Sequence, residues 1–316
     1  MNKGLKCIIA CLLCLHFGSG AFIYELKVLR KKNSSQGNYH YFIGCGDFHD
    51  KAHPANKEQR AAIEQILAGC DKDSTLVLLE DLSSKGSSGR HACGRFFVNS
   101  RGGVLGGLAE KAREQGVTVD NLEYRYCRVS SLGPVLNNLT SEPKSFPSVA
   151  QTSVTALAKE IDQVVKEIES YDDGAVLDDY YRKDIVNVMT ELNKLGLAEA
   201  GSASIADYLV ENSNDKNRLD VLKHLLTFDS ILFDAKLAHA IVNADQKNII
   251  AFAGGSHIGR VATMLIKDGY EQLESTKIAF TKEHDLRFCL GSNIVEGKYC
   301  VRPKPIALDL IKKLLK

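Results

Sequence analysis

Short apolar runs alternate with amphipathic stretches along the first part of the chain. Residues 39–44 and 75–79 are predicted strands, and the continuous apolarity of the second indicates burial on both faces of a parallel sheet. Between them, a predicted helix begins at Pro54 and carries an apolar face with a period of three to four residues. A short helix at 108–115 and a strand-like segment at 117–126 follow. This alternation predicts βαβ units.

The middle of the chain has helical periodicity alone. Apolar residues recur at steps of three and four between Val154 and Ile168, which predicts an amphipathic helix. Further helices are predicted over 175–195, 204–211 and 218–244. Such a long stretch without a strand predicts an all-helical insertion or cap on a sheet domain.

Strand character returns at 248–253, and the helix that follows ends at Gly269. Toward the C-terminus the pattern predicts three more strands and a final helix, over 270–280, 286–290, 299–301 and 306–315. The predicted fold class is therefore α/β: a mixed or mostly parallel sheet flanked by helices, with an all-helical insertion. The predicted sheet domain occupies 22–142 and 245–316, and the insertion occupies 143–244.

Residues 1–21 are a predicted signal peptide. Two lysines precede an apolar run at 7–17, and the small residues Ser19 and Ala21 suit cleavage before Phe22. The run is shorter than the roughly 20 residues that a membrane span needs. A secreted or periplasmic protein is therefore predicted. Membrane attachment is expected only if this segment is an uncleaved or lipidated anchor.

Export changes what the nine cysteines predict. Three of them lie in the signal peptide, and the remaining even number in an oxidising compartment predicts disulfides. Cys289 and Cys300 flank a predicted turn and are candidates for a bridge across a hairpin. The other four allow three pairings, which stay open: Cys45, Cys70, Cys93 and Cys127. For Cys45, a disulfide or a buried thiol is favoured over a nucleophile.

Composition and charge exclude two classes of protein. The chain has 316 residues, and its 40 Lys and Arg balance 39 Asp and Glu. A nucleic-acid binder needs a dominant basic surface, which this balance does not offer. With 44% hydrophobic residues, the chain is also not of the disordered class. A globular protein that acts on a small-molecule or peptide substrate fits these values.

Candidate chemistry lies where the predicted strands end. A G-x-x-H motif follows each of two strands, at 46–49 and at 254–257. Glu80 follows the strand at 75–79. Because the carboxyl ends of parallel strands share one edge of a sheet, His49, Glu80 and His257 are predicted to converge. Two imidazoles and a carboxylate can bind a divalent metal, or they can activate water without one.

These motifs resemble those of the Tiki/TraB superfamily, whose relatives include erythromycin-esterase-like enzymes and ChaN-like haem-uptake lipoproteins. Residues 46–53 with Gln59 are similar to the ChaN-like opening G-E-x-H-D and its later His and Gln. Residues 252–259 with the following Gly-Tyr are similar to the G-A-G-H-L…G-Y segment of TraB-like domains, and 75–81 to the family's V-x-L-E strand. Asp234 stands at an acidic position of the family's penultimate helix.

The resemblance implies an exported, metal-dependent hydrolase that cleaves a peptide or an ester bond. His49, Glu80 and His257 would hold a divalent metal (Mn, Zn or Co), with Asp47 as a further ligand or general base. Three more residues are candidates for supporting roles: Asp50, as a partner that orients His49, together with His53 and Asp234. The alternative is a ChaN-like protein that binds haem or iron for uptake without catalysis.

Two positions depart from the family's pattern. Asp47 stands where most members have Glu, which shortens the side chain by one methylene. Phe233 stands where TraB-like members have an Arg before the acidic residue, here Asp234. A guanidinium is therefore expected from the glycine-rich segment 83–107 instead. The same segment is predicted to close over the substrate as a lid. The candidates there are Arg90, Arg95 and Arg101. His53 precedes Pro54, which disfavours a helix carrying both His49 and His53 as ligands.

Overall fold

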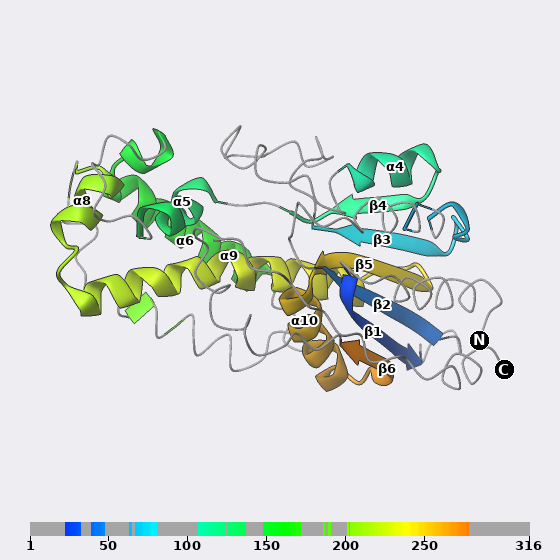
Figure 1. The fold of residues 1–316 in the computed structure, drawn as a ribbon. Coiled ribbons are helices and arrows are strands. Elements are labelled where there is room, and N and C mark those ends of the chain that lie inside the picture. The colour runs from blue at the N-terminus through cyan, green and yellow to red at the C-terminus, as the bar shows by residue number, and fades with distance from the viewer. Residues whose placement is uncertain are drawn as a thin grey trace, which may run out of the picture.

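The computed structural model describes residues 23–32, 39–47, 63–64, 67–80, 107–123, 126–136, 148–171, 186, 189–190, 201 and 203–277. They form an α/β fold in which helices flank a mixed six-stranded sheet (Figure 1). The predicted class, a mixed sheet with flanking helices, is confirmed. The predicted signal peptide at 1–21 and every element predicted beyond residue 280 lie outside the described residues.

The sheet has the strand order β4-β3-β5-β2-β1-β6. Its strands are β1 (Ile23–Lys32), β2 (Tyr39–Asp47), β3 (Thr75–Leu79), β4 (Thr118–Asn121), β5 (Asn248–Gly254) and β6 (Glu271–Lys277). β4, β3, β5 and β2 run parallel, whereas β1 is antiparallel to both of its neighbours, β2 and β6. Because β5 lies between β2 and β3, the carboxyl ends of four strands share one edge.

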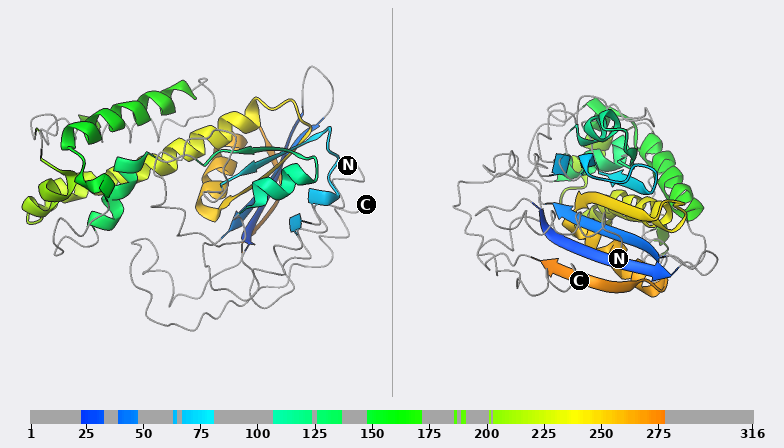
Figure 2. Two further views of the ribbon diagram at one scale, coloured as in Figure 1. Left: turned by 90° about the horizontal axis from the view of Figure 1, so that it is seen from above. Right: turned by 90° about the vertical axis from the view of Figure 1, so that its right-hand side faces the viewer.

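Every described element between β4 and β5 is a helix. The described helices are α4 (Leu108–Glu114), α5 (Cys127–Leu136), the 3-10 helix η3 (Ser148–Gln151), α6 (Val154–Ser170), α8 (Ile205–Glu211), α9 (Lys216–Val242) and α10 (Gly255–Lys267). Figures 1 and 2 show α5, α6 and α8 gathered away from the sheet, with α9 running back to α10. Within the described chain, no helix is both long and apolar enough to cross a membrane.

Strand side chains alternate between two helix-covered faces. Phe42 of β2 and Ile249 of β5 pack in the core that includes residues of α9 and α10. Their neighbours Ile43 and Ile250 point the other way and pack with α4. β5 is buried along its whole length, as expected of a strand with parallel neighbours on both sides and helices over both faces.

Side chains satisfy the first backbone N–H groups of three helices. Ser153 precedes α6 and Ser204 precedes α8, and each hydroxyl accepts a hydrogen bond from an N–H of the first turn. The start of α5 is capped from α6 instead. Glu160 accepts from the N–H of Arg128 at 2.6 Å and from that of Val129 at 2.9 Å. These caps fix where the helices begin.

Glycines let α10 approach β2 closely. A Cβ on Gly44 would lie 2.7 Å from Cγ2 of Ile258, and one on Gly46 would lie 2.6 Å from Cα of Gly255. No real Cβ tolerates such distances, so these positions hold the first turns of α10 against the sheet. α10 ends at Lys267, and Gly269 two residues later has a φ of +89°, which agrees with the predicted stop at this glycine.

The apolar pattern predicts neither β1 nor α5. Val28 and Leu29 of β1 are adjacent and both buried because they pack on opposite, helix-covered faces of the sheet, so β1 lacks the apolar–polar alternation of a half-exposed strand. α5 contains Gly133 and Pro134, which are the poorest helix formers, yet its apolar residues at three-residue steps are buried. Of the helix predicted at 175–195, only residues 186 and 189–190 are described, and these are helical.

Candidate functional site

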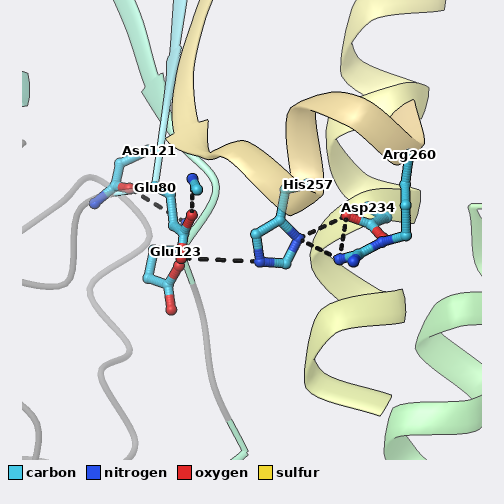
Figure 3. A network of polar contacts seen from close by, with 7 residues as sticks. Glu80, Asn121, Glu123, Asp234, His257 and Arg260 are labelled. Carbon is cyan, nitrogen blue, oxygen red and sulfur yellow. Dashed lines mark hydrogen bonds and ion pairs between the residues drawn. The ribbon is translucent and has the colours of Figure 1, made fainter. Parts of the chain in front are cut away.

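Three strand ends bring polar side chains to one edge of the sheet. Glu80 follows β3, Asn121 ends β4 with Glu123 two residues on, and β5 leads into α10, whose first turn carries His257. These side chains belong to buried residues, with exposures of 2%, 5%, 3% and 8% respectively. Figure 3 shows Glu80 and Glu123 on the Nε2 side of the imidazole, and Asp234 and Arg260 on its Nδ1 side.

Glu80 is fixed through both its backbone and its carboxylate. Its N–H donates to the carbonyl of Phe252 at 3.0 Å, which ties the end of β3 to β5. Its Oε2 accepts a hydrogen bond from the N–H of Gly254 at 2.7 Å. Since Gly254 is the N-cap of α10, the carboxylate lies by the positive end of that helix. The hydrogen bond from Gly254 and the helix N-terminus both stabilise a negative charge on Glu80.

His257 stands between two carboxylates. Its Nδ1 is 2.6 Å from Oδ1 of Asp234, and its Nε2 is 4.0 Å from Oε1 of Glu80 (Figure 3). Nη2 of Arg260 also lies 3.0 Å from Nδ1. Because guanidinium and carboxylate are already paired, we assign the hydrogen to Nδ1, which donates to Asp234. A neutral His257 then directs the lone pair of Nε2 toward Glu80.

Opposing influences set the pKa of His257. Burial acts to lower it, whereas the charge of Glu80 and then the hydrogen bond and charge of Asp234 raise it. The Arg260 guanidinium opposes the carboxylates. On balance the pKa is raised above its ordinary value, so the carboxylates outweigh burial and the ring accepts a proton more readily than a free imidazole.

α9 and α10 together hold the imidazole from behind. Asp234, on α9, is fully buried, and its Oδ2 accepts a hydrogen bond from Nε of Arg260. Arg260 lies one helical turn after His257 on α10, so both side chains leave the helix toward α9. The ring of Phe233 meets the imidazole edge-on, with centroids 4.7 Å apart. The ring is therefore restrained by a carboxylate and by an aromatic contact.

The structure brings together three of the predicted site residues: Glu80, Asp234 and His257. Asp47 is the last residue of β2, where its backbone is in register with Gly254 of β5. The remaining candidates lie outside the described residues: His49, Asp50, His53, Arg90, Arg95 and Arg101.

Sequence reasoning missed three residues of this edge. The guanidinium beside Asp234 comes from Arg260 of α10. Arg260 is three residues after His257, a spacing that places both side chains on the same face of a helix and could have pointed to it. Asn121 and Glu123 lie inside the predicted strand-like segment 117–126, whereas β4 ends at Asn121, so neither stood at a predicted strand end. Asn121 Oδ1 accepts from the N–H of Glu123 at 3.2 Å and so shapes the turn after β4.

The donor atoms at this edge suit a divalent metal. Nε2 of His257 and Oε1 of Glu80 are 4.0 Å apart, somewhat more than the roughly 3.4 Å between two tetrahedral ligands at metal–ligand distances of about 2.0–2.2 Å, so the two side chains would move closer on binding one ion. Among the described residues, no group of three or more His, Cys, Asp or Glu is placed to hold an ion. The predicted third ligand, His49, is not among them.

Cys45 lies in β2 as a fully buried, free thiol. Burial raises its pKa far above the ordinary value, so the thiolate that a nucleophile requires is disfavoured. This agrees with the predicted buried thiol and not with a catalytic cysteine.

Comparisons of this chain with protein-family models, with curated proteins and with solved structures find no match.

Proposed function

We propose that the protein is an exported, metal-dependent hydrolase of the Tiki/TraB/ChaN type, which cleaves a peptide or an ester bond. The observation that carries the proposal is the setting of His257. Its Nδ1 is held by the buried Asp234, and its Nε2 faces Glu80 where parallel strands end. The short motifs around these residues supply the family, and the helices between β4 and β5 support the Tiki/ChaN-like arrangement with its insertion at 143–244.

Each residue has a definite task in this proposal. Asp234 keeps the hydrogen on Nδ1, so that Nε2 of His257 is the coordinating atom, and Glu80 and His49 complete the ligand set. A divalent metal held there would lower the pKa of a bound water and polarise the scissile carbonyl. Asp47, at the end of β2, is the proposed base that takes a proton from the attacking water. The N-terminus of α10 favours negative charge at this edge.

The test is hydrolysis of nitrophenyl esters and of quenched fluorescent peptides, each with Mn²⁺, Zn²⁺ or Co²⁺ and then with a chelator. His257→Ala and Glu80→Gln are expected to reduce the rate of hydrolysis by at least about a hundredfold. Loss of a residue that only supports a metal ligand already costs up to about a hundredfold, and these two residues are the proposed ligands themselves. Thr263→Ala is the matched control because it changes an exposed residue of the same helix. Full activity in His257→Ala on any substrate that the wild type cleaves would contradict the site.

The same variants separate the proposal from haem uptake. A Soret band on mixing the wild type with haemin, absent in His257→Ala and without hydrolysis by either protein, would favour the binding alternative. Chelator-sensitive hydrolysis without haemin binding supports the hydrolase.

A further inference from the structure

One carboxylate outside the site joins two segments that lead into it. Glu167, near the C-terminus of α6, accepts a hydrogen bond from the hydroxyl of Tyr126 on Oε2 at 2.6 Å. Its Oε1 is 2.8 Å from Nζ of Lys236. Tyr126 lies three residues after Glu123, and Lys236 lies two residues after Asp234. The two oxygens of Glu167 therefore hold the chain that carries Glu123 and the helix that carries Asp234.

This bridge is enclosed. The side chain of Lys236 is 10% exposed and that of Glu167 is 24% exposed, so water screens their attraction only weakly. Tyr171, the C-cap residue of α6, covers the pair: its hydroxyl is 3.4 Å from Oε1 of Glu167, and its ring centroid is 6.0 Å from Nζ of Lys236. Both charges thus have defined partners.

A buried ion pair gives little stability over an apolar pair of the same size, so its geometry is the more informative feature. Here the geometry links opposite sides of His257. Glu123 belongs to the Nε2 side and Asp234 to the Nδ1 side (Figure 3). α6 supplies a bridge between Tyr126 and α9 through Glu167.

We propose that Glu167 is a positioning residue of the candidate site, because it fixes the Glu123 segment and α9 relative to one another around His257. The inference rests on the proposed function only for the identity of the site. The bridge itself makes no contact with the reacting groups. It acts by keeping Oδ1 of Asp234 at hydrogen-bond distance from Nδ1 of His257, where a small shift of α9 breaks the contact.

The experiment follows the imidazole by NMR in the full-length protein. The variants are Tyr126→Phe, which removes one hydroxyl; Lys236→Met, which removes the charge at similar length; and Glu167→Gln, which removes the charge that pairs with Lys236. Each is expected to shift the Nδ1–H proton and the ring nitrogen signals of His257. Ser153→Ala is the control, because it weakens the N-cap of α6 without touching the bridge.

The affinity for Zn²⁺ alone is the second readout. It is expected to fall about threefold to tenfold in Glu167→Gln, the range that coupled residues away from a ligand produce. In a double-mutant cycle, Tyr126→Phe should cause little further loss of Zn²⁺ affinity when Glu167 is already replaced. If Glu167→Gln does not fold, Tyr126→Phe decides alone.

Unchanged His257 signals in Tyr126→Phe and Lys236→Met, or equal shifts in Ser153→Ala, would overturn the positioning role. Failure of the proposed function looks different. The His257 signals would still respond to the bridge, while the wild type itself would neither bind Zn²⁺ nor hydrolyse any substrate.

Discussion

Carboxylates outnumber guanidinium groups among the described residues labelled around His257. Among the residues labelled in Figure 3, three buried carboxylates (Glu80, Glu123 and Asp234) face one guanidinium, that of Arg260. Protonation of His257 would offset part of the remaining negative charge, and so would a divalent cation bound between Nε2 and Glu80. Against the effect of burial, two of these carboxylates, Glu80 and then Asp234, raise the pKa of His257 above its ordinary value.

Asp234→Asn tests how much this arrangement depends on the carboxylate behind the ring. The change leaves Arg260 beside a neutral amide and replaces one of the two acceptor oxygens by an NH2 group, so His257 and Arg260 are left with a single, uncharged acceptor. A loss of about 2–3 kcal/mol in the free energy of unfolding is expected, less than for a fully buried pair because the side chain of Arg260 is 37% exposed. Urea titration measures it.

The control for Asp234→Asn is an exposed pair of the same kind, Arg30 and Glu271. Glu271→Gln is expected to cost about 0–1 kcal/mol, as is usual at the surface. Equal effects of the two substitutions would show that the Asp234 pair has no special role.

His40 supplies a pH dependence at the opposite end of β2. Its Nδ1 lies 2.7 Å from the hydroxyl of Tyr270. Burial, and then the charge of Lys31, lower the pKa of His40 below its ordinary value, against a hydrogen bond to the backbone of Gln246. The folded protein therefore binds this proton less readily than the unfolded chain does. The stability linked to His40 is present above the unfolded pKa of 6.5 and is lost as the pH falls through the lower folded value.

His40→Gln is accordingly expected to reduce the loss of stability on going from about pH 7.5 to about pH 5.5. Urea unfolding of wild type and variant at both pH values gives the difference. A variant that loses as much stability as the wild type, or more, would contradict the assignment.

The sequence found the residues of the site that follow apolar strands, because strand ends are visible in a single chain. Glu80 and His257 were found in this way, and the family resemblance added Asp234. Arg260 was missed because its role depends on α9 lying beside α10, a contact between helices that no local pattern encodes. Glu123 was missed because β4 is short and mostly exposed, so its end was not recognised.

At the scale of elements, the contact between α10 and β2 decides where His257 stands. Gly46 pairs with Glu25 of β1 and touches the first turn of α10, so the helix begins directly above the strand. Elements with a strong period were predicted within one or two residues, as β3 and α6 show. β1 and α5 were not, because β1 has apolar residues on both of its faces and the Gly-Pro pair obscures the helical period of α5.

Gly46→Ala is expected to destabilise the protein by about 1–3 kcal/mol, the usual cost of overpacking. The new Cβ would meet Cα of Gly255, which is backbone and cannot turn aside. The measurement is thermal or urea unfolding. Displacement of α10 should also shift the NMR signals of His257.

Gly259→Ala is the matched control on the same helix. Its Cβ would meet nothing closer than Oε1 of Glu25 at 3.5 Å, an ordinary contact. This variant is expected to be neutral or slightly more stable, because alanine favours helix by up to about 1 kcal/mol. Similar destabilisation in both variants would argue against a specific close approach at Gly46.

For the whole molecule, the order of strands produces the site. β5 follows the helical segment in the chain but lies between β2 and β3 in the sheet, which places Glu80 and His257 just after the ends of two adjacent strands, β3 and β5. The sequence predicted that these residues converge, but not this order, since pairing of distant strands is set by packing over the whole core. α9 completes the arrangement by carrying Asp234 from the helical part to the sheet (Figure 1).

The most direct measurement is anomalous diffraction from crystals grown with Zn²⁺ or Mn²⁺. We expect a metal peak about 2.0–2.2 Å from Nε2 of His257 and from the Glu80 carboxylate, and we expect it to disappear in His257→Ala. A well-ordered Glu80 and His257 without such a peak at saturating metal would contradict this expectation, as would a peak that survives the substitution.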